Sequence, residues 1–98
     1  MTLEDVKPYC DKYGFIVEDI FGNIHISTKY ERWQFAENDN PMAKVRLMHR
    51  NKLCDGWHEQ FRRNISAENL ILYIYEHETA KYKGDIICHF HKNGKEKR

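Results

Sequence analysis

The chain has 98 residues and a formal net charge of +1, and 41% of its residues are hydrophobic and 13% aromatic. A chain of this length forms one domain with a modest core, and this composition is too apolar for a disordered polypeptide. The sequence therefore excludes a multidomain or intrinsically disordered protein. It predicts a single domain over residues 1–91, followed by a solvated tail at 92–98.

The sequence shows none of the usual targeting signals. Its first ten residues carry charges and a proline where a secretory signal needs an apolar run, and no apolar stretch approaches the roughly 20 residues that cross a bilayer. Three widely spaced cysteines, Cys10, Cys54 and Cys88, do not match the paired framework of a small secreted domain. We therefore expect a cytoplasmic protein without a membrane segment.

The first predicted element is a helix that begins near Thr2 and ends at Gly14. Thr2 followed by Asp5 is typical of a helix start, because each residue can bond the backbone N–H of the other. Apolar residues then recur at helical spacing, at Leu3, Val6, Cys10 and Tyr13. Because proline is tolerated only in the first turn, Pro8 suggests that the regular part begins nearer Asp5.

Five strands are predicted next. Residues 15–20 and 24–28 are rich in β-branched side chains and flank a glycine turn, which is typical of a hairpin. Three further strands, over residues 30–37, 43–50 and 57–63, are separated by turn-forming segments rich in Asn, Asp, Pro and Gly. The pattern predicts an antiparallel meander.

Alternation assigns two faces to this meander. The predicted core face carries Trp33, Phe35, Val45, Leu47, Trp57 and Phe61. The opposite face carries polar and basic residues, among them Arg32, Gln34, Lys44, Arg46, Met48, Arg50, His58, Gln60 and Arg62. With its large aromatic side chains predicted on the core face, the sheet is not expected to stack the bases of a single strand.

A second helix and a last strand complete the predicted fold. Ser66 is placed to cap a helix whose apolar stripe follows at Leu70, Ile71 and Ile74. Residues 86–91 alternate like an edge strand. The sequence thus predicts an α+β domain, in which an antiparallel sheet of about five strands packs against two helices, with an edge strand at its carboxyl end.

Charge is unevenly distributed and indicates two candidate binding surfaces. Residues 1–41 hold eight acids and four bases, a net of −4, whereas residues 42–98 hold twelve bases and seven acids, a net of +5. The basic candidates for binding phosphate or an acidic protein are Arg32, Lys44, Arg46, Arg50, Arg62 and Arg63. The acidic candidates, which could imitate phosphates, are Glu31, Glu37 and Asp39. A sheet face that is simply solvated explains the basic residues as well.

A structural zinc site is a further candidate. His89 and His91 lie two apart on one predicted strand face, and Cys54 and His58 flank a turn, so four ligands could meet. Solvent-facing histidines explain the same pattern. No nucleophile motif, phosphate-binding glycine loop or other catalytic signature is present in the sequence, so we expect neither an enzyme nor a bound cofactor.

Several segments between residues 23 and 82 resemble small uncharacterised proteins of phages and prophages of Gram-positive bacteria. They are residues 23–33, 47–52, 57–60 and 73–78. The resemblance implies an accessory protein of a mobile element, of which the anti-CRISPR inhibitors are one kind. It implies no activity for individual residues.

Three functional hypotheses follow from the sequence. The first is a non-enzymatic inhibitor from a mobile element that binds a host protein, such as a nuclease or nucleoprotein complex, through the acidic or basic residues. The second is a small nucleic-acid-binding protein that uses the basic sheet face. The third is a zinc-supported structural module.

Overall fold

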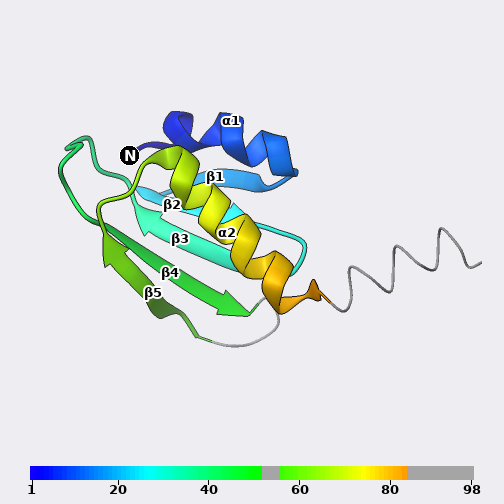
Figure 1. The fold of residues 1–98 in the computed structure, drawn as a ribbon. Coiled ribbons are helices and arrows are strands. Elements are labelled where there is room, and N and C mark those ends of the chain that lie inside the picture. Colours follow the sequence, from blue (N-terminus) through cyan, green and yellow to red (C-terminus); the bar gives the residue numbers. More distant parts are fainter. Residues whose placement is uncertain (52–55, 84–98) are drawn as a thin grey trace, which may run out of the picture.

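The protein is an α+β domain of two helices and one five-stranded antiparallel sheet (Figure 1). The computed structural model describes residues 1–51 and 56–83. The elements in chain order are α1 (Leu3–Tyr13), β1 (Ile16–Ile20), β2 (Asn23–Ser27), β3 (Glu31–Ala36), β4 (Val45–Asn51), β5 (His58–Arg63) and α2 (Ala67–Lys81). The sheet follows the chain in the order β1-β2-β3-β4-β5, and both helices cover the same face of it (Figure 1).

This architecture confirms the predicted fold class, hairpin and meander. The predicted edge strand at 86–91 and the tail at 92–98 lie outside the described residues. Neither described helix combines the length and the apolar character needed to cross a membrane.

Helix α1 begins earlier than the proline suggested. The backbone N–H of Thr2 donates to Asp5 Oδ2 at 2.9 Å, which caps the first turn, and the helix runs from Leu3 through Pro8. Pro8 removes one backbone hydrogen bond, but Val6 and Cys10 on the buried side of the helix are fully enclosed. Tertiary packing therefore holds the helix across its proline.

The core lies between the helices and the sheet. Its fully or almost fully buried apolar side chains come from α1, α2 and the three central strands: Val6, Cys10, Ile24, Ile26, Trp33, Phe35, Leu47, Leu70, Ile71 and Ile74. Ser66 Oγ accepts a hydrogen bond from the backbone N–H of Asn69 at 3.2 Å and so caps α2, as predicted. Trp33, Phe35 and Leu47 confirm the predicted core face.

Strand β5 departs from simple alternation because it contains a β-bulge. Leu47 pairs with Phe61 and Met48 pairs with Glu59, so Gln60 is an extra residue without its own partner in β4. Gln60 Nε2 donates to the Tyr73 hydroxyl of α2 at 2.7 Å, and the Phe61 ring contacts the same tyrosine. Both side chains therefore face the helices, and the alternation of residues 57–59 is reversed relative to the prediction.

The β1–β2 hairpin holds a strained residue at its tip. Phe21 has φ 52° and Gly22 has φ 83°, the positive values of a two-residue turn that favours Asn-Gly. The Phe21 side chain is 101% exposed, so its replacement forfeits no packing.

We expect Phe21→Asn to raise the free energy of unfolding by about 1 kcal/mol, because asparagine adopts the left-handed conformation at lower cost. Equilibrium denaturation in urea measures the change. Phe21→Val, which adds a β-branched side chain at positive φ, should have the opposite sign. Equal free energies of unfolding for the two variants would show that the backbone at position 21 is not strained.

Candidate functional site

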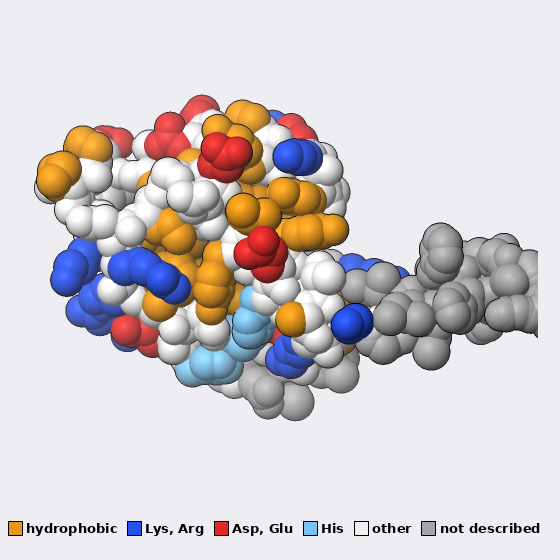
Figure 2. Space-filling model, viewed as in Figure 1, with side chains coloured by type: hydrophobic (Ala, Val, Ile, Leu, Met, Phe, Trp, Pro, Cys, Tyr) orange, Lys and Arg blue, Asp and Glu red, His pale blue; other side chains and the backbone are white. Residues whose placement is uncertain are grey.

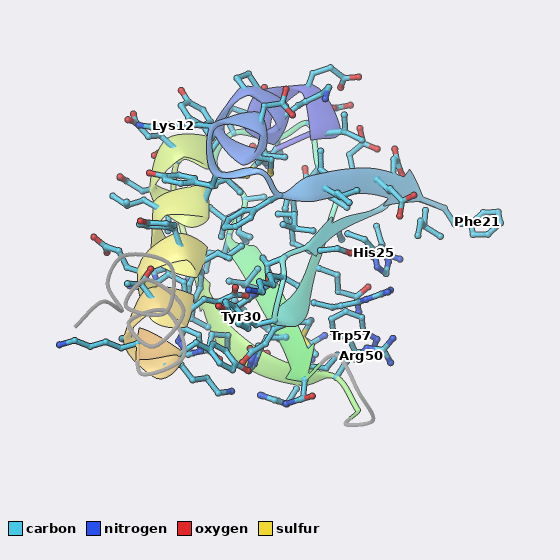
Figure 3. The ribbon with its side chains drawn as sticks, turned by 90° about the vertical axis from the view of Figure 1, so that its right-hand side faces the viewer. Lys12, Phe21, His25, Tyr30, Arg50 and Trp57 are labelled. Carbon is cyan, nitrogen blue, oxygen red and sulfur yellow. The ribbon has the colours of Figure 1, made fainter. Side chains whose placement is uncertain are left out.

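No described element covers the sheet face opposite the helices. Residues that alternate with the buried ones in the central strands point to this side, among them His25, Arg32, Gln34, Met48 and Arg50. Figure 3 shows Phe21, His25, Arg50 and Trp57 on the side of the sheet away from α2. We call this surface the open face.

Trp57 lies on the open face, and its prediction as a core residue was wrong. Its ring centroid is 4.7 Å from the Arg50 guanidinium carbon and 5.8 Å from the His25 ring, with the two ring planes at 83° (Figure 3). The bulge at Gln60 is the physical reason, because one extra residue reverses the facing of the residues before it. An aromatic ring that can stack thus lies on the polar side of the sheet.

Arg50, beside Trp57, and its cross-strand neighbour Arg32 have no acidic partner among the described residues. Arg32 and Arg50 are directly opposite each other in β3 and β4, and within the described segments neither forms an ion pair. The Nε atom of Arg50 is buried and has no hydrogen-bond partner among these residues. Partial burial, offset by Glu18 and reinforced by the two arginines, lowers the pKa of His25. His25, Arg32, Arg50 and Trp57 form the open-face cluster.

The other basic candidates are arranged differently. Arg46 and Arg62 pair across β4 and β5, and both contact Glu59 Oε1, at 2.8 and 3.2 Å. The hydrogen bond from Arg46 is the main cause that lowers the pKa of Glu59. Lys44 is exposed just before β4. Arg63 lies on the helix side, where its guanidinium covers the Phe61 ring at 4.0 Å, so it is not part of the open face.

Among the acidic candidates, Glu31 is separated from Glu37 and Asp39. Glu31 is fully buried beneath α2, so its prediction as a surface residue was wrong; strand alternation places it on the same side as Trp33. Glu37 and Asp39 are exposed beyond the end of β3. Slight desolvation and then the charges of Asp19 and Asp39 raise the pKa of Glu37, which indicates that these carboxylates lie near one another.

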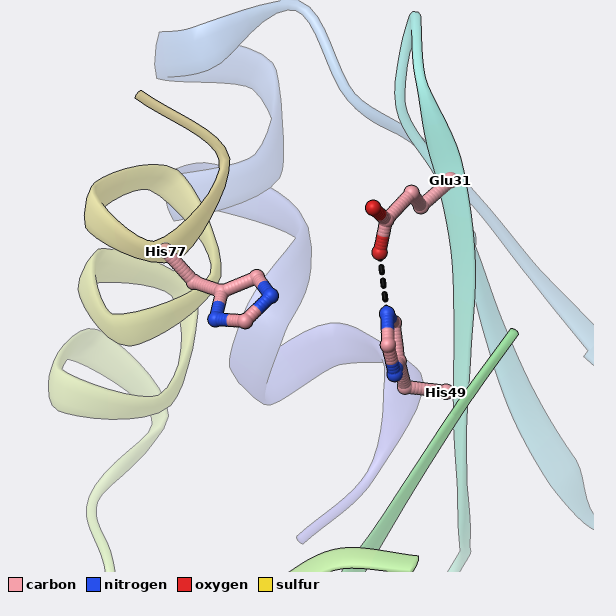
Figure 4. A group of neighbouring side chains, drawn as sticks. All are labelled: Glu31, His49 and His77. Carbon is pink, nitrogen blue, oxygen red and sulfur yellow. Dashed lines mark hydrogen bonds and ion pairs between the residues drawn. The ribbon is translucent and has the colours of Figure 1, made fainter. Parts of the chain in front are cut away.

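A polar group lies between the sheet and α2 near the β5 edge. It consists of Glu31, His49, His58 and His77, which we call the histidine cluster. His49 Nε2 is bonded to Glu31 Oε1 (Figure 4), and His49 Nδ1 lies 2.8 Å from His58 Nε2. The His77 ring lies edge-on to that of His49, with centroids 5.5 Å apart and ring planes at 76°. Figure 2 shows histidine side chains gathered at the surface below α2, and His58 is exposed there.

The second oxygen of Glu31 is held by residues at the end of α2. Glu31 Oε2 accepts from Lys81 Nζ and from the Tyr82 hydroxyl, each at 2.6 Å. Burial alone raises the pKa of Glu31, but the bonds from Lys81, Tyr82 and His49 outweigh it and lower the pKa. Burial and the hydrogen bond to Glu31 raise the pKa of Tyr82. Glu31 is therefore an ionised carboxylate inside the fold.

Glu78 is a second buried carboxyl group in this region. Its Oε2 accepts from Thr28 Oγ1 at 2.6 Å and from Trp33 Nε1 at 2.8 Å. Burial raises its pKa, against the lowering effect of these two hydrogen bonds. The group ties α2 to the turn before β3 and to the central tryptophan of the sheet.

Of the four predicted zinc ligands, the structure describes only His58. Cys54, His89 and His91 lie outside the described residues. His58, predicted on the polar sheet face, instead turns toward α2, because the bulge reverses its facing. Sequence analysis missed His49 and His77, although His49 shares the inward parity of Leu47, a position where a polar side chain needs a buried partner.

Two surfaces with distinct chemistry result. The open-face cluster offers a stacking ring and two guanidinium groups that form no ion pair with a described residue. The histidine cluster offers imidazole and carboxylate ligands. Comparison of the chain with protein-family models, with curated proteins and with solved structures finds no match to any of them.

Proposed function

We propose that the protein binds single-stranded nucleic acid on the open face of its sheet. One base would stack on Trp57, and Arg32 and Arg50 would contact the phosphates on either side of it. This develops the second hypothesis from the sequence, that of a basic nucleic-acid-binding sheet face, and adds the aromatic residue that the sequence pattern had assigned to the core.

The observation that carries the proposal is the position of Trp57 beside Arg50. Sequence-tolerant binding of single strands combines an aromatic platform with cations that follow the backbone, and both are present within 4.7 Å here. The guanidinium of Arg50 supports it further, since it forms no ion pair with a described residue and can pair with a phosphate instead.

The nucleic-acid reading explains more of the structure than mimicry of nucleic acid by an acidic patch. The predicted acidic set loses Glu31, which is buried, and retains Glu37 and Asp39 at one end of the sheet. The inhibitor hypothesis and its mobile-element setting remain predictions from the sequence. If the open face binds a protein instead, the oligonucleotide test below should show no binding.

The test is titration of a labelled oligothymidylate or oligouridylate of about 12 nucleotides, followed by fluorescence anisotropy. We expect Trp57→Ala to weaken binding about 5- to 150-fold, which corresponds to the roughly 1–3 kcal/mol of one base stacked on an aromatic ring. Trp57→Phe should retain part of the affinity. Affinity of the wild-type protein should also fall steeply between about 50 and 200 mM salt.

A charge reversal with a matched control tests the arginines. Arg50→Glu should weaken binding and reduce the steepness of the salt dependence by about 0.7 or more in log–log slope, because at least one phosphate contact is lost. Lys12→Glu makes the same charge change on α1, away from the open face (Figure 3), and should have little effect. Equal losses in both variants, or no binding by the wild-type protein, would refute the proposal.

A further inference from the structure

We propose that Glu31, His49 and His77 form a binding site for a divalent transition-metal ion of the Zn²⁺ type. The three residues come from β3, β4 and α2, and one ligand atom from each lies within 4.8 Å of the others (Figure 4). This site is separate from the open-face cluster, because it lies on the helix side of the sheet. It also differs from the zinc ligands that the sequence pattern suggested.

The donor set suits such an ion. Two imidazole nitrogens and one carboxylate oxygen are the ligands of three-residue zinc sites that leave a fourth position for water or substrate, and of related Fe²⁺ sites. Ligands on one tetrahedral ion at about 2.1 Å lie about 3.4 Å apart. To bind the ion, the His77 ring would move inward by about 1.4 Å at most, and the hydrogen bond between Glu31 Oε1 and His49 Nε2 would open so that both atoms face the ion. His77 is half-buried and lies on the last turns of α2, where such a movement is local.

His77 supplies the observation that indicates a missing ligand. Its Nε2 atom is buried and has no hydrogen-bond partner among the described residues. Its ring is held between aromatic neighbours, with the Trp33 ring 5.2 Å and the Tyr73 ring 6.0 Å away. A buried imidazole nitrogen without a partner is disfavoured, whereas a metal ion beside Glu31 and His49 would use its lone pair.

The groups behind the ligands are arranged as metal sites require. Without metal, His49 Nε2 donates to Glu31 Oε1. Metal binding would require the other tautomer, in which His49 Nδ1 donates to His58 Nε2, 2.8 Å away, and the lone pair of Nε2 faces the ion. Lys81 and Tyr82 hold Glu31 Oε2, which leaves Oε1 as a single carboxylate ligand. Exposed His58 marks the side from which an ion would enter.

The experiment measures Zn²⁺ binding to the full-length, untagged, metal-stripped protein by competition with a chromogenic chelator. We expect one equivalent to bind, and His77→Phe to weaken that binding about 100-fold or more while keeping a ring in the same packing. His25→Phe, the same substitution on the open face, should leave the affinity unchanged. Circular dichroism and thermal unfolding without metal verify that each variant folds.

A second arm separates this site from the one suggested by the sequence. A variant with Cys54→Ser, Cys88→Ser, His89→Gln and His91→Gln should retain the wild-type affinity. The Co²⁺ complex of the wild-type protein should show weak d–d absorption without the intense thiolate charge-transfer band. The assignment would be overturned if this variant lost Zn²⁺ binding or if the wild-type Co²⁺ complex showed a thiolate band. Unchanged Zn²⁺ affinity in both His77→Phe and His77→Gln would also overturn it. No binding of either metal ion by the wild-type protein would also overturn it.

Discussion

Replacing Trp33 with alanine is expected to lower the free energy of unfolding by about 3–5 kcal/mol, the usual cost of removing a large aromatic side chain from a packed core. Trp33 is 0% exposed and lies at the centre of the sheet. Its ring contacts those of His49, at 4.4 Å between centroids, and of His77, at 5.2 Å. A small domain has only about 5–15 kcal/mol of stability, so this single change removes a large fraction of it.

The same substitution also affects a buried hydrogen bond. Trp33 Nε1 donates to Glu78 Oε2 at 2.8 Å, and Thr28 Oγ1 donates to the same oxygen. The substitution removes the first of these two hydrogen bonds to the buried carboxyl group. Trp33→Phe isolates this contribution, because it preserves most of the ring and removes the N–H. We expect a loss of about 1–3 kcal/mol for Trp33→Phe.

Denaturant titration followed by circular dichroism measures both variants. Trp57→Ala is the matched control, since it removes the same side chain from the other side of the sheet, where we expect a cost of about 1 kcal/mol from its contact with Arg50. If Trp33→Ala and Trp57→Ala were equally destabilising, the assignment of the two tryptophans to opposite sides would be wrong. Trp33→Phe still gives a measurable transition if the alanine variant does not fold.

Replacing Glu31 with alanine is expected to lower the free energy of unfolding by about 1–3 kcal/mol, because it leaves the buried His49 without its hydrogen-bond acceptor. Glu31 is 0% exposed and accepts from His49, Lys81 and Tyr82. Of these partners, Lys81 is 44% exposed and can turn to solvent, but the buried His49 cannot. The loss therefore falls mainly on the contact between β3 and β4 and on the end of α2.

Glu37→Ala is the control for this prediction. Glu37 lies just beyond the same strand and is exposed, so its replacement should change the free energy of unfolding by no more than about 0.5 kcal/mol. Urea denaturation of both variants in metal-free buffer separates the structural role of Glu31 from metal binding. A Glu31→Ala protein as stable as Glu37→Ala would show that the bonds of the buried Glu31 carboxylate contribute nothing to folding.

Local patterns were sufficient for most of the fold. The Thr2 and Ser66 helix starts, the glycine hairpin and the alternation of Trp33, Phe35 and Leu47 each depend on residues close together in the chain. The α+β class follows from them, because an amphipathic sheet and two amphipathic helices bury their apolar faces together. These are features that backbone geometry and side-chain period determine without long-range information.

The candidate sites were only partly predictable. The alternation of residues correctly predicted the side of the sheet for four arginines. Three of them lie in the regular strands β3 and β4, and the fourth follows the bulge in β5: Arg32, Arg46, Arg50 and Arg62. Trp57 and His58 were assigned to the wrong sides, because period-2 alternation was carried through β5 as if no residue had been inserted. Nothing local in residues 57–63 distinguishes the bulged strand from a regular one.

The sequence by itself determined the elements, their order and the general division of apolar and basic residues. Alternation places Glu31 on the same side as Trp33, but only the tertiary structure decided which groups satisfy it there. Its partners Lys81 and Tyr82 are about fifty residues away in the chain and reach it through the packing of α2 on the sheet. The same packing brings His77 to His49. A carboxylate or imidazole is a surface group or a buried ligand according to which distant side chains satisfy it, and chain periodicity carries no information about those partners.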